Sequence, residues 1–224
     1  MQNRSYSIWR RRWSRKLIGL FMAMTLTAAL AACGKNETSG EGSSGGNESS
    51  GGEESKEPEA DRHHVEITIK DYGTISVELY REVAPITVDN FLKLAEDGFY
   101  DGLTFHRIVD GFMMQGGDPE GTGYGGSDET ITGEFEANGH KNSLSHTRGA
   151  ISMARSQDFD SASSQFFIVH KDSTQLDRWY ACFGYVTEGM DVVDAICQSV
   201  PVTDDGEYVA KENQPVIESI KVID

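Results

Sequence analysis

The residues most suggestive of chemistry lie in the stretch FHRIVDGFMMQGGD, residues 105–118. It places a single arginine, Arg107, among Phe and Met side chains, with Gln115 close behind. Nothing in it resembles an activated nucleophile. His106 is the one side chain that titrates near neutral pH, and we interpret it as a packed, structural residue. The stretch therefore predicts a fixed cation beside an apolar pocket and a reaction without a proton shuttle.

Strand geometry determines which of these side chains meet. In a hairpin that turns at Asp110-Gly111, Arg107 shares one sheet face with Met113 and Gln115, because alternate residues of a strand point the same way. The segment SQFFIV is a second apolar strand in which Gln165 and Phe167 share a face. The two strands of the hairpin and the strand SQFFIV, three in all, are thus expected to carry these side chains.

The other elements follow from hydrophobic periodicity and turn residues. Alternation around the turn DYG at residues 71–73 predicts a β-hairpin. Ala84-Pro85 opens a helix with the apolar face Val88, Phe91, Leu92 and Ala95, and Gly98 ends it. Further elements are expected as strands at 104–109, 112–115, 150–155, 165–169 and 215–222, and as a second helix near 190–197. Many short strands with two helices predict a mainly β fold built as a closed antiparallel barrel, since closure removes exposed strand edges.

Several motifs, taken together and in order, resemble one known family. They are FHRIVDGFMMQGGD, the GTG that follows it, SMAR at 152–155, SSQFFIV at 163–169 and LDRWYACFGYV at 176–186. In this combination and spacing they resemble the cyclophilin-type peptidyl-prolyl cis-trans isomerases. The resemblance covers residues 64–224, and it implies a closed eight-stranded antiparallel β-barrel capped by two α-helices.

The resemblance also implies roles for residues at matching positions. Arg107 matches the catalytic arginine, and Gln115 matches the glutamine that bonds the substrate backbone and helps hold that arginine. Other matching residues belong to the proline pocket (Phe112, Met113, Phe167, Leu176) and to the peptide groove (Ala154, Arg155, Gln165). Tyr180 replaces a frequent histidine and stays in the pocket as a flat wall. No metal and no cofactor is implied.

The sequence departs from the common family pattern in the loops. Gln175 replaces a tryptophan, Arg155 replaces an asparagine, and Arg178-Trp179 replaces a turn that usually carries glycine. The loop of residues 156–163 is one residue longer than its commonest form. None of these departures changes Arg107.

The composition divides the chain into a basic leader and an acidic body. The chain carries 20 Lys and Arg against 36 Asp and Glu, and six of the basic residues lie in residues 1–33, which hold no acid. The remainder therefore carries 14 − 36 = −22, a charge that argues against nucleic acid or anionic lipid as a partner.

The leader predicts export and lipid anchoring. A basic segment precedes the apolar run LIGLFMAMTLTAALAA, whose length of about 24 Å as a helix is short for a membrane span. The residues Leu30-Ala31-Ala32-Cys33 resemble a bacterial lipobox. We therefore expect a signal peptide at residues 1–32, a lipidated Cys33 and an extracytoplasmic, membrane-anchored protein.

A tether and one folded domain are expected to follow. Residues 35–60 are rich in Gly, Ser and Glu and lack Val, Leu, Ile and aromatic residues, so they cannot bury enough apolar surface to fold. We assign residues 33–61 to the lipidated cysteine and tether, and residues 62–224 to the isomerase domain. A barrel without open edges is compatible with a monomer, which we expect.

Other chemistry-like patterns are interpreted as structural. GGDPEGTGYGG, residues 116–126, lacks the GK[ST] of a phosphate-binding loop and is expected to be a surface loop. His63-His64 lies at the edge of the tether without further ligands. Whether Cys182 and Cys197 form a disulfide stays open, because the sequence does not show how close they are.

Three functions remain as hypotheses. The first is an isomerase that accelerates X–Pro rotation in unfolded or extended exported polypeptides. The second is a non-catalytic module or holdase that binds proline-containing segments in the same groove. Retention of Arg107 favours the first hypothesis, since binding alone needs no transition-state donor. The third, a solute receptor for a transporter, requires two α/β lobes that residues 62–224 do not supply.

Overall fold

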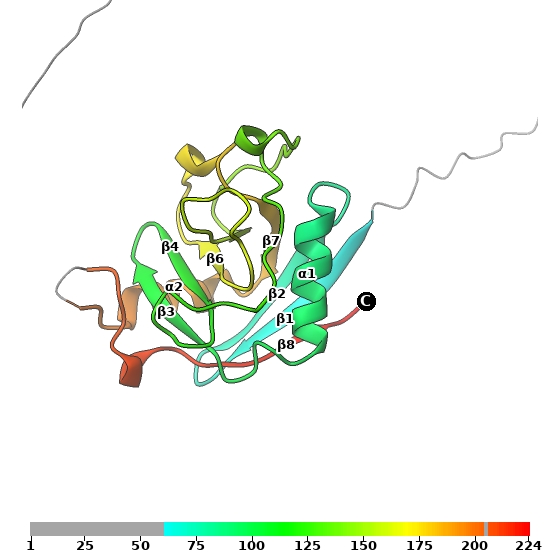
Figure 1. Ribbon diagram of the computed structural model, residues 1–224. Helices are drawn as coiled ribbons and strands as arrows, with labels where there is room; N and C mark the ends of the chain where they lie inside the picture. Colours follow the sequence, from blue (N-terminus) through cyan, green and yellow to red (C-terminus); the bar gives the residue numbers. More distant parts are fainter. Residues whose placement is uncertain (1–60, 204–205) are drawn as a thin grey trace, which may run out of the picture. The chain divides into compact units, whose positions relative to one another are not determined.

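The computed structural model describes residues 61–203 and 206–224 (Figure 1). The predicted signal peptide of residues 1–32, the predicted lipidation at Cys33 and residues 34–60 of the predicted tether lie outside the described residues. Within the described part of the chain, neither helix is long and apolar enough to cross a membrane.

The domain is built on one antiparallel sheet with the strand order β3-β4-β6-β5-β7-β2-β1-β8. Its strands are β1 (Arg62–Ile69), β2 (Gly73–Tyr80), β3 (Thr104–Val109), β4 (Met113–Asp118), β5 (Ala150–Met153), β6 (Phe166–Val169), β7 (Cys182–Glu188) and β8 (Ile217–Val222). The mainly β architecture with two α-helices is confirmed. Strand β7 was expected only as part of a motif, without bounds.

The prediction of a closed barrel is wrong. The sheet is strongly curled but open, with β3 and β8 as its two end strands. These ends meet only around the isolated bridge between Thr104 and Val216, where the Ile217 amide donates to Leu103 O at 2.8 Å. The two strands therefore do not form a continuous ladder.

A short loop segment, residues 207–209, takes the place of β8 farther along β3. The Ile108 amide donates to Glu207 O at 2.8 Å, and the Val209 amide donates to His106 O at 2.9 Å. This segment satisfies backbone groups on the outer edge of β3 that a closed barrel would pair with β8. It is the physical reason why the sheet stays open there.

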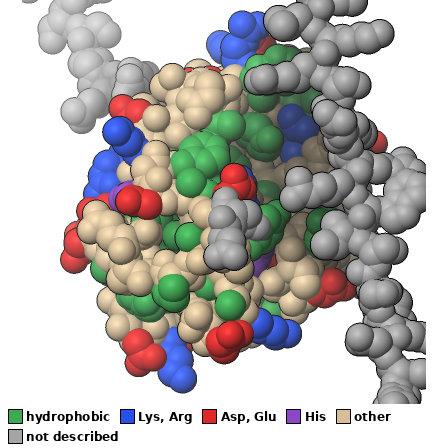
Figure 2. Space-filling view, turned by 90° about the vertical axis from the view of Figure 1, so that its left-hand side faces the viewer, with side chains coloured by type: hydrophobic (Ala, Val, Ile, Leu, Met, Phe, Trp, Pro, Cys, Tyr) green, Lys and Arg blue, Asp and Glu red, His purple; other side chains and the backbone are tan. Residues whose placement is uncertain are grey.

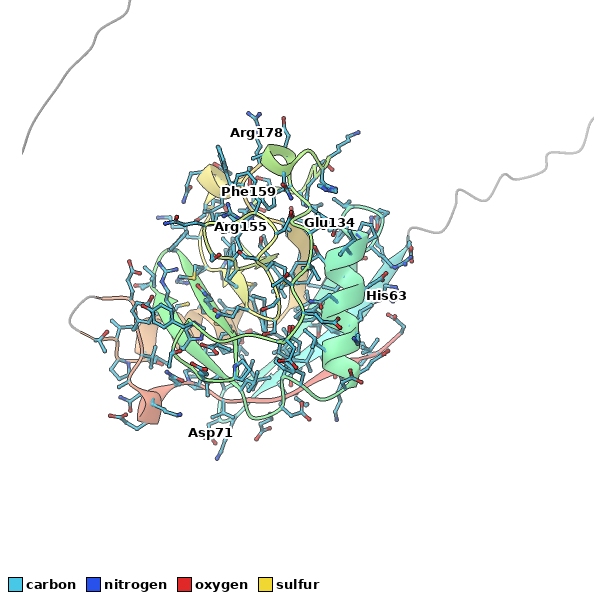
Figure 3. The ribbon with its side chains drawn as sticks, viewed as in Figure 1. His63, Asp71, Glu134, Arg155, Phe159 and Arg178 are labelled. Carbon is cyan, nitrogen blue, oxygen red and sulfur yellow. The ribbon has the colours of Figure 1, made fainter. Side chains whose placement is uncertain are left out.

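The first helix begins where a distant carboxylate bonds its free amides. Helix α1 (Pro85–Glu96) has Pro85 in its first turn, and its N-cap, Ala84, offers no side-chain cap. Glu134, which is 3% exposed, supplies the cap instead (Figure 3). Its carboxylate accepts from the amides of Ile86 (3.1 Å) and Thr87 (2.8 Å) and from Thr87 Oγ1 (2.7 Å).

Both helices pack the faces that their periodicity predicts against the core, although Leu92 of α1 is only partly buried. Val88, Phe91 and Ala95 of α1 are buried, and Gly98 follows the helix with φ +68°. Helix α2 (Met190–Ser199) buries Val192, Val193, Ile196 and Cys197. Helix α1 packs against β8 and β2, and α2 packs against β2 and β4 (Figure 1). Short 3₁₀ helices occupy Glu136–Asn138, Thr174–Leu176 and Lys211–Asn213.

The pleat of the sheet separates two apolar clusters. On β4, Met114 belongs to the main core and its neighbour Met113 to a smaller cluster. On β6, Phe166 packs in the main core and Phe167 in the smaller cluster. Successive side chains of a strand point to opposite faces, so the smaller cluster lies on the face away from the main core. It is this second cluster that forms the site described below.

Replacing Glu134 with alanine is expected to lower the free energy of unfolding by about 1–3 kcal/mol, because two helix amides and a hydroxyl lose their acceptor in a buried place. Urea unfolding of the folded domain measures this change. Glu96→Ala, which removes an exposed carboxylate from the same helix, is the control. Equal losses in the two variants would contradict the capping role of Glu134.

Candidate active site

A cavity of about 130 Å³ opens over the smaller apolar cluster. Nine of the ten residues predicted for the site line it: Arg107, Phe112, Met113, Gln115, Ala154, Arg155, Phe167, Leu176 and Tyr180. The tenth, Gln165, lies beside it and lines an adjoining cavity. The structure therefore brings all ten predicted residues into one region. Figure 2 views the side of the domain where β3 and β4 lie and shows hydrophobic side chains gathered in its middle, with charged side chains mostly around them.

The Arg107 guanidinium is held on two sides at the rim of this pocket. Its Nε and Nη2 donate to Oε2 of Glu207 at 2.9 and 2.7 Å, and its Nη1 donates to Oε1 of Gln115 at 3.4 Å. The Arg107 side chain is 25% exposed. The cation is therefore fixed, partly out of water and next to apolar walls, as the sequence predicts.

A row of amide side chains connects Arg107 to a loop. Cross-strand pairing places Gln115 opposite both Arg107 of β3 and Phe167 of β6. Gln115 Nε2 donates to Oε1 of Gln165 at 2.8 Å, and Gln165 Nε2 donates to Gly125 O at 2.7 Å. The Gln115 nitrogen is used as a donor to Gln165, so the Gln115 oxygen is the atom that faces Arg107 and accepts from it.

The apolar wall of the pocket rests on a buried histidine. Phe167 stacks on the His146 ring, with centroids 5.9 Å apart and planes 17° apart, and meets Tyr180 edge-on at 5.9 Å. His146 Nδ1 is hydrogen-bonded to the Asp177 carboxylate at 2.8 Å. Asp177 directly follows the pocket residue Leu176 in the sequence. A polar network behind the wall therefore fixes the position of its rings.

Arg155 also lines the pocket, and its side chain packs among three rings. Its guanidinium carbon lies 4.7–5.1 Å from the ring centroids of Tyr180, Phe159 and Phe135. Nε and Nη2 donate to Trp179 O at 3.2 and 2.8 Å. Figure 3 shows Arg155 close to Phe159, below Arg178. Stacking and hydrogen bonds together immobilise this second cation.

The adjoining cavity, of about 290 Å³, extends the groove past Ala154, Arg155 and Gln165 to the loop of residues 123–127. Asp118 shapes this loop by accepting from the amides of Glu120, Thr122 and Gly123. Burial of Asp118 opposes ionisation, but these backbone donors outweigh it and lower the pKa of the carboxyl. The amides that a phosphate would need are thus occupied. Residues 119–126 form the predicted loop, whereas Gly116, Gly117 and Asp118 are buried and end β4.

Comparison with known proteins assigns the family. The model of the cyclophilin type peptidyl-prolyl cis-trans isomerase/CLD family matches residues 64–222. This chain belongs to the cyclophilin family. It is accordingly a peptidyl-prolyl cis-trans isomerase, as the sequence motifs predict.

Relatives of this cyclophilin include bacterial enzymes and solved structures. Peptidyl-prolyl cis-trans isomerase B of Bacillus subtilis is 50% identical over 123 residues, which cover 55% of this chain and 82% of the relative. An isomerase of Helicobacter pylori is 46% identical over 134 residues, 58% of this chain and 79% of the relative. The crystal structure of a Cryptosporidium parvum cyclophilin, determined in the presence of the dipeptide Ala-Pro, has a TM-score of 0.64 and 30% identity and covers 72% of this chain and 99% of that chain.

One departure from the cyclophilin pattern has a local structural consequence. Arg178, which replaces a turn that usually carries glycine, adopts φ +71°, a left-handed conformation that non-glycine residues rarely adopt. Its guanidinium pairs with Glu136 at 2.7 Å, and its carbonyl accepts from the Ala137 amide at 2.9 Å. The backbone hydrogen bond ties this turn to the 3₁₀ helix Glu136–Asn138, and the next residue, Trp179, accepts from Arg155 through its carbonyl.

Other reactive side chains of this cyclophilin are structural. Ser152 Oγ and His146 Nε2 lie 3.0 Å apart, so Ser152, His146 and Asp177 follow the order of a hydrolase triad. Ser152 and His146 are fully buried, however, and no substrate carbonyl reaches them. His106 is also buried, 1% exposed, which agrees with its interpretation as a packed residue.

Cysteines and acidic side chains show no sign of metal or disulfide chemistry among residues 61–203 and 206–224. Cys182 and Cys197 are both buried free thiols, and burial raises the pKa of each to about 12. No group of three or more His, Cys, Asp or Glu side chains in these ranges is arranged to hold a metal ion.

Two site features were not predicted from the sequence. Glu207 lies 100 positions after Arg107 in a loop without periodicity, so no local pattern links the two. His146 sits in the irregular segment between the 3₁₀ helix Glu136–Asn138 and β5. The only signal for His146 is indirect, since Asp177, its partner, directly follows the pocket residue Leu176.

The buried histidines make stability depend on pH. Burial lowers the pKa of His146, although Asp177 opposes this, and burial likewise lowers the pKa of His106. In each case the folded-state pKa lies below the unfolded value of about 6.5. The stabilisation that the neutral, buried histidine contributes is therefore complete above about pH 6.5 and is lost as the pH falls below that value. We therefore expect the free energy of unfolding to decline from about pH 6.5 downward.

Denaturant unfolding at a series of pH values measures this decline. His146→Asn is expected to make the free energy of unfolding depend less steeply on pH below about 6.5, because it removes one of the two buried histidines whose pKa is lowered. His140→Asn, a change at a partly exposed histidine, is expected to keep the wild-type slope. A His146→Asn curve with the full wild-type slope would contradict this account.

Proposed function

We propose that the pocket beside Arg107 binds the proline ring of an X–Pro segment and that Arg107 is the catalytic residue. The observation that carries the proposal is a guanidinium fixed at the rim of an apolar pocket, with Nη1 on the side of Gln115. The ring-binding residues would be Phe112, Met113, Phe167, Leu176 and Tyr180.

Rotation about the X–Pro bond needs only a well-placed donor. The barrier of about 18–20 kcal/mol comes from amide resonance, and unaided rotation takes tens to hundreds of seconds. When the bond is twisted by 90°, the proline nitrogen becomes pyramidal and regains a lone pair. A guanidinium N–H placed at that nitrogen bonds the twisted form and not the planar one, so Arg107 stabilises the transition state selectively.

The size of the barrier that has to be removed shows that the hydrogen bond from Arg107 does not act alone. A turnover of about 10³ per second requires the barrier to fall by roughly 7 kcal/mol. One charged hydrogen bond supplies about 2–3 kcal/mol. The remainder has to come from fixing the ring and the flanking backbone and from the low polarity of the pocket. No proton is transferred and no covalent bond is formed.

The peptide backbone on either side of the proline would lie along the groove. Gln115 and Gln165 offer amide donors and acceptors there, and Ala154 and Arg155 line both cavities. The relative from Cryptosporidium parvum was crystallised in the presence of Ala-Pro. We infer from these features that proline-containing unfolded or extended polypeptides are the substrates.

A non-catalytic proline-binding module is the less favoured alternative. Binding alone would be served by the apolar wall and the amide row, and would not need a charged donor at the rim. In this protein Arg107 is retained and supported from two sides.

Replacing Arg107 with alanine is expected to lower kcat/KM at least about tenfold, because the twisted bond loses its charged donor. An NMR exchange or rapid optical assay of a short X–Pro peptide measures this. Arg81→Ala, which removes an exposed, ion-paired arginine outside the site, is expected to leave activity unchanged. Equal activity of the Arg107→Ala variant and the wild type would overturn the assignment.

We further propose that the isomerase works outside the cytoplasm, as a monomer anchored through Cys33 by a tether that spans about 28 Å on average. The support is the sequence of residues 1–61: a basic and apolar leader, the lipobox-like Leu30-Ala31-Ala32-Cys33, and a Gly/Ser/Glu-rich segment. The clients would then be exported polypeptides whose X–Pro bonds limit folding.

Replacing Cys33 with serine is expected to abolish lipid attachment, because the acyl group is carried by the cysteine sulfur. Expression of the full chain in a bacterium with labelled fatty acid, followed by membrane fractionation, measures both properties. The Cys197→Ser variant is expected to stay labelled and membrane-bound. Labelling that persists in the Cys33→Ser variant would contradict the anchor proposal.

A further inference from the structure

We propose that Glu207 is a positioning residue for Arg107: its carboxylate holds one edge of the guanidinium so that the opposite N–H groups face the pocket. The inference rests on the proposed catalytic role of Arg107. It adds a residue from outside the pocket, since Glu207 is not among the residues that line the cavity.

The hydrogen bonds define which edge is held. Nε and Nη2 both donate to the same oxygen, Oε2 of Glu207, at 2.9 and 2.7 Å. A guanidinium has five N–H groups in a rigid plane. Glu207 takes two of them and Gln115 takes one, so one N–H on each terminal nitrogen remains for a peptide. Once one edge is fixed, the planar group has little freedom to turn.

The Glu207 carboxylate is itself placed by the backbone. The Ile108 amide donates to Glu207 O at 2.8 Å, the Val209 amide donates to His106 O at 2.9 Å, and Tyr208 forms a bridge with Arg107. Residues 207–209 thus run beside β3 like an added strand. This backbone pairing fixes Glu207 next to Arg107, so the carboxylate is already close to the guanidinium in the folded loop.

The exposure of the pair indicates positioning and not stabilisation of the fold. The side chains of Arg107 and Glu207 are 25% and 46% exposed. Ion pairs in such places contribute little to folding. A long arginine side chain has many rotamers, however, and a donor that is already oriented needs no reorganisation when the bond twists.

Kinetics of Glu207 variants test this role. Glu207→Ala is expected to lower kcat about five- to tenfold while KM changes less than about twofold, because the donor is misplaced in the transition state. Glu207→Gln, which keeps an acceptor oxygen, is expected to retain more activity than Glu207→Ala. Glu212→Ala removes an exposed carboxylate from the same connection between α2 and β8 and is expected to match the wild type.

A double-mutant cycle separates positioning from a general effect. Adding Glu207→Ala to the Arg107→Ala variant is expected to cause no further loss of kcat, since the group that Glu207 holds is gone. If both losses multiply instead, Glu207 acts independently of Arg107 and the inference is wrong. If Arg107→Ala alone has no effect, it is the proposed function that fails.

The Arg107 side chain gives a readout without substrate. In the wild type its Nε–H is hydrogen-bonded, so its NMR signal is expected to be visible and slow to exchange with water. In Glu207→Ala this signal is expected to disappear or to exchange at least about tenfold faster, while Glu212→Ala leaves it unchanged. A protected Nε–H in Glu207→Ala, or wild-type kcat in that variant, would overturn the inference.

Discussion

A cation that stabilises a twisted X–Pro bond has to keep one orientation, because a donor that is free to turn must reorganise when the bond twists. This requirement on Arg107 organises the surrounding structure. Strand pairing supplies Gln115, and the segment of residues 207–209 along β3 supplies Glu207. In each case the partner reaches the arginine through backbone hydrogen bonds of the sheet or its edge, so the position of the guanidinium is set by the fold.

The same sheet serves two environments. Its pleat sends Met114 and Phe166 into the main core, and Met113 and Phe167 into the pocket wall. Behind the wall, His146 and Asp177 form a buried polar support for the Phe167 ring. The pocket can therefore stay open to a ligand while the rings that form it are held by contacts on their other side.

Much of this could be predicted from local sequence patterns. The β1–β2 and β3–β4 hairpins, both helices and the face shared by Arg107 and Gln115 follow from a period of two or 3.6 residues and from turn residues, which act over short distances. The motifs placed the other pocket residues, because their order and spacing match a known family. The ten predicted residues therefore came together in one region.

The parts that sequence patterns missed depend on contacts between distant segments. The sheet stays open because residues 207–209, and not β8, pair with the edge of β3 there. The strand pattern of the sequence does not indicate which of the two segments pairs with β3. Arg155 was expected in the peptide groove, but its packing among three rings from separate loops was not predicted. Such contacts follow from loop conformation, and periodicity carries no information about it.

The central claim is that Arg107 bonds the twisted X–Pro bond more strongly than the planar one. Its most direct test is NMR exchange on a labelled Ala-Pro peptide, which gives separately the affinities of the cis and trans forms and the rotation rate on the protein. For Arg107→Lys, which keeps the charge but loses the planar fork, we expect affinities within about twofold of the wild type and rotation at least about tenfold slower. Unchanged rotation on the protein with weaker binding of both forms would contradict the account.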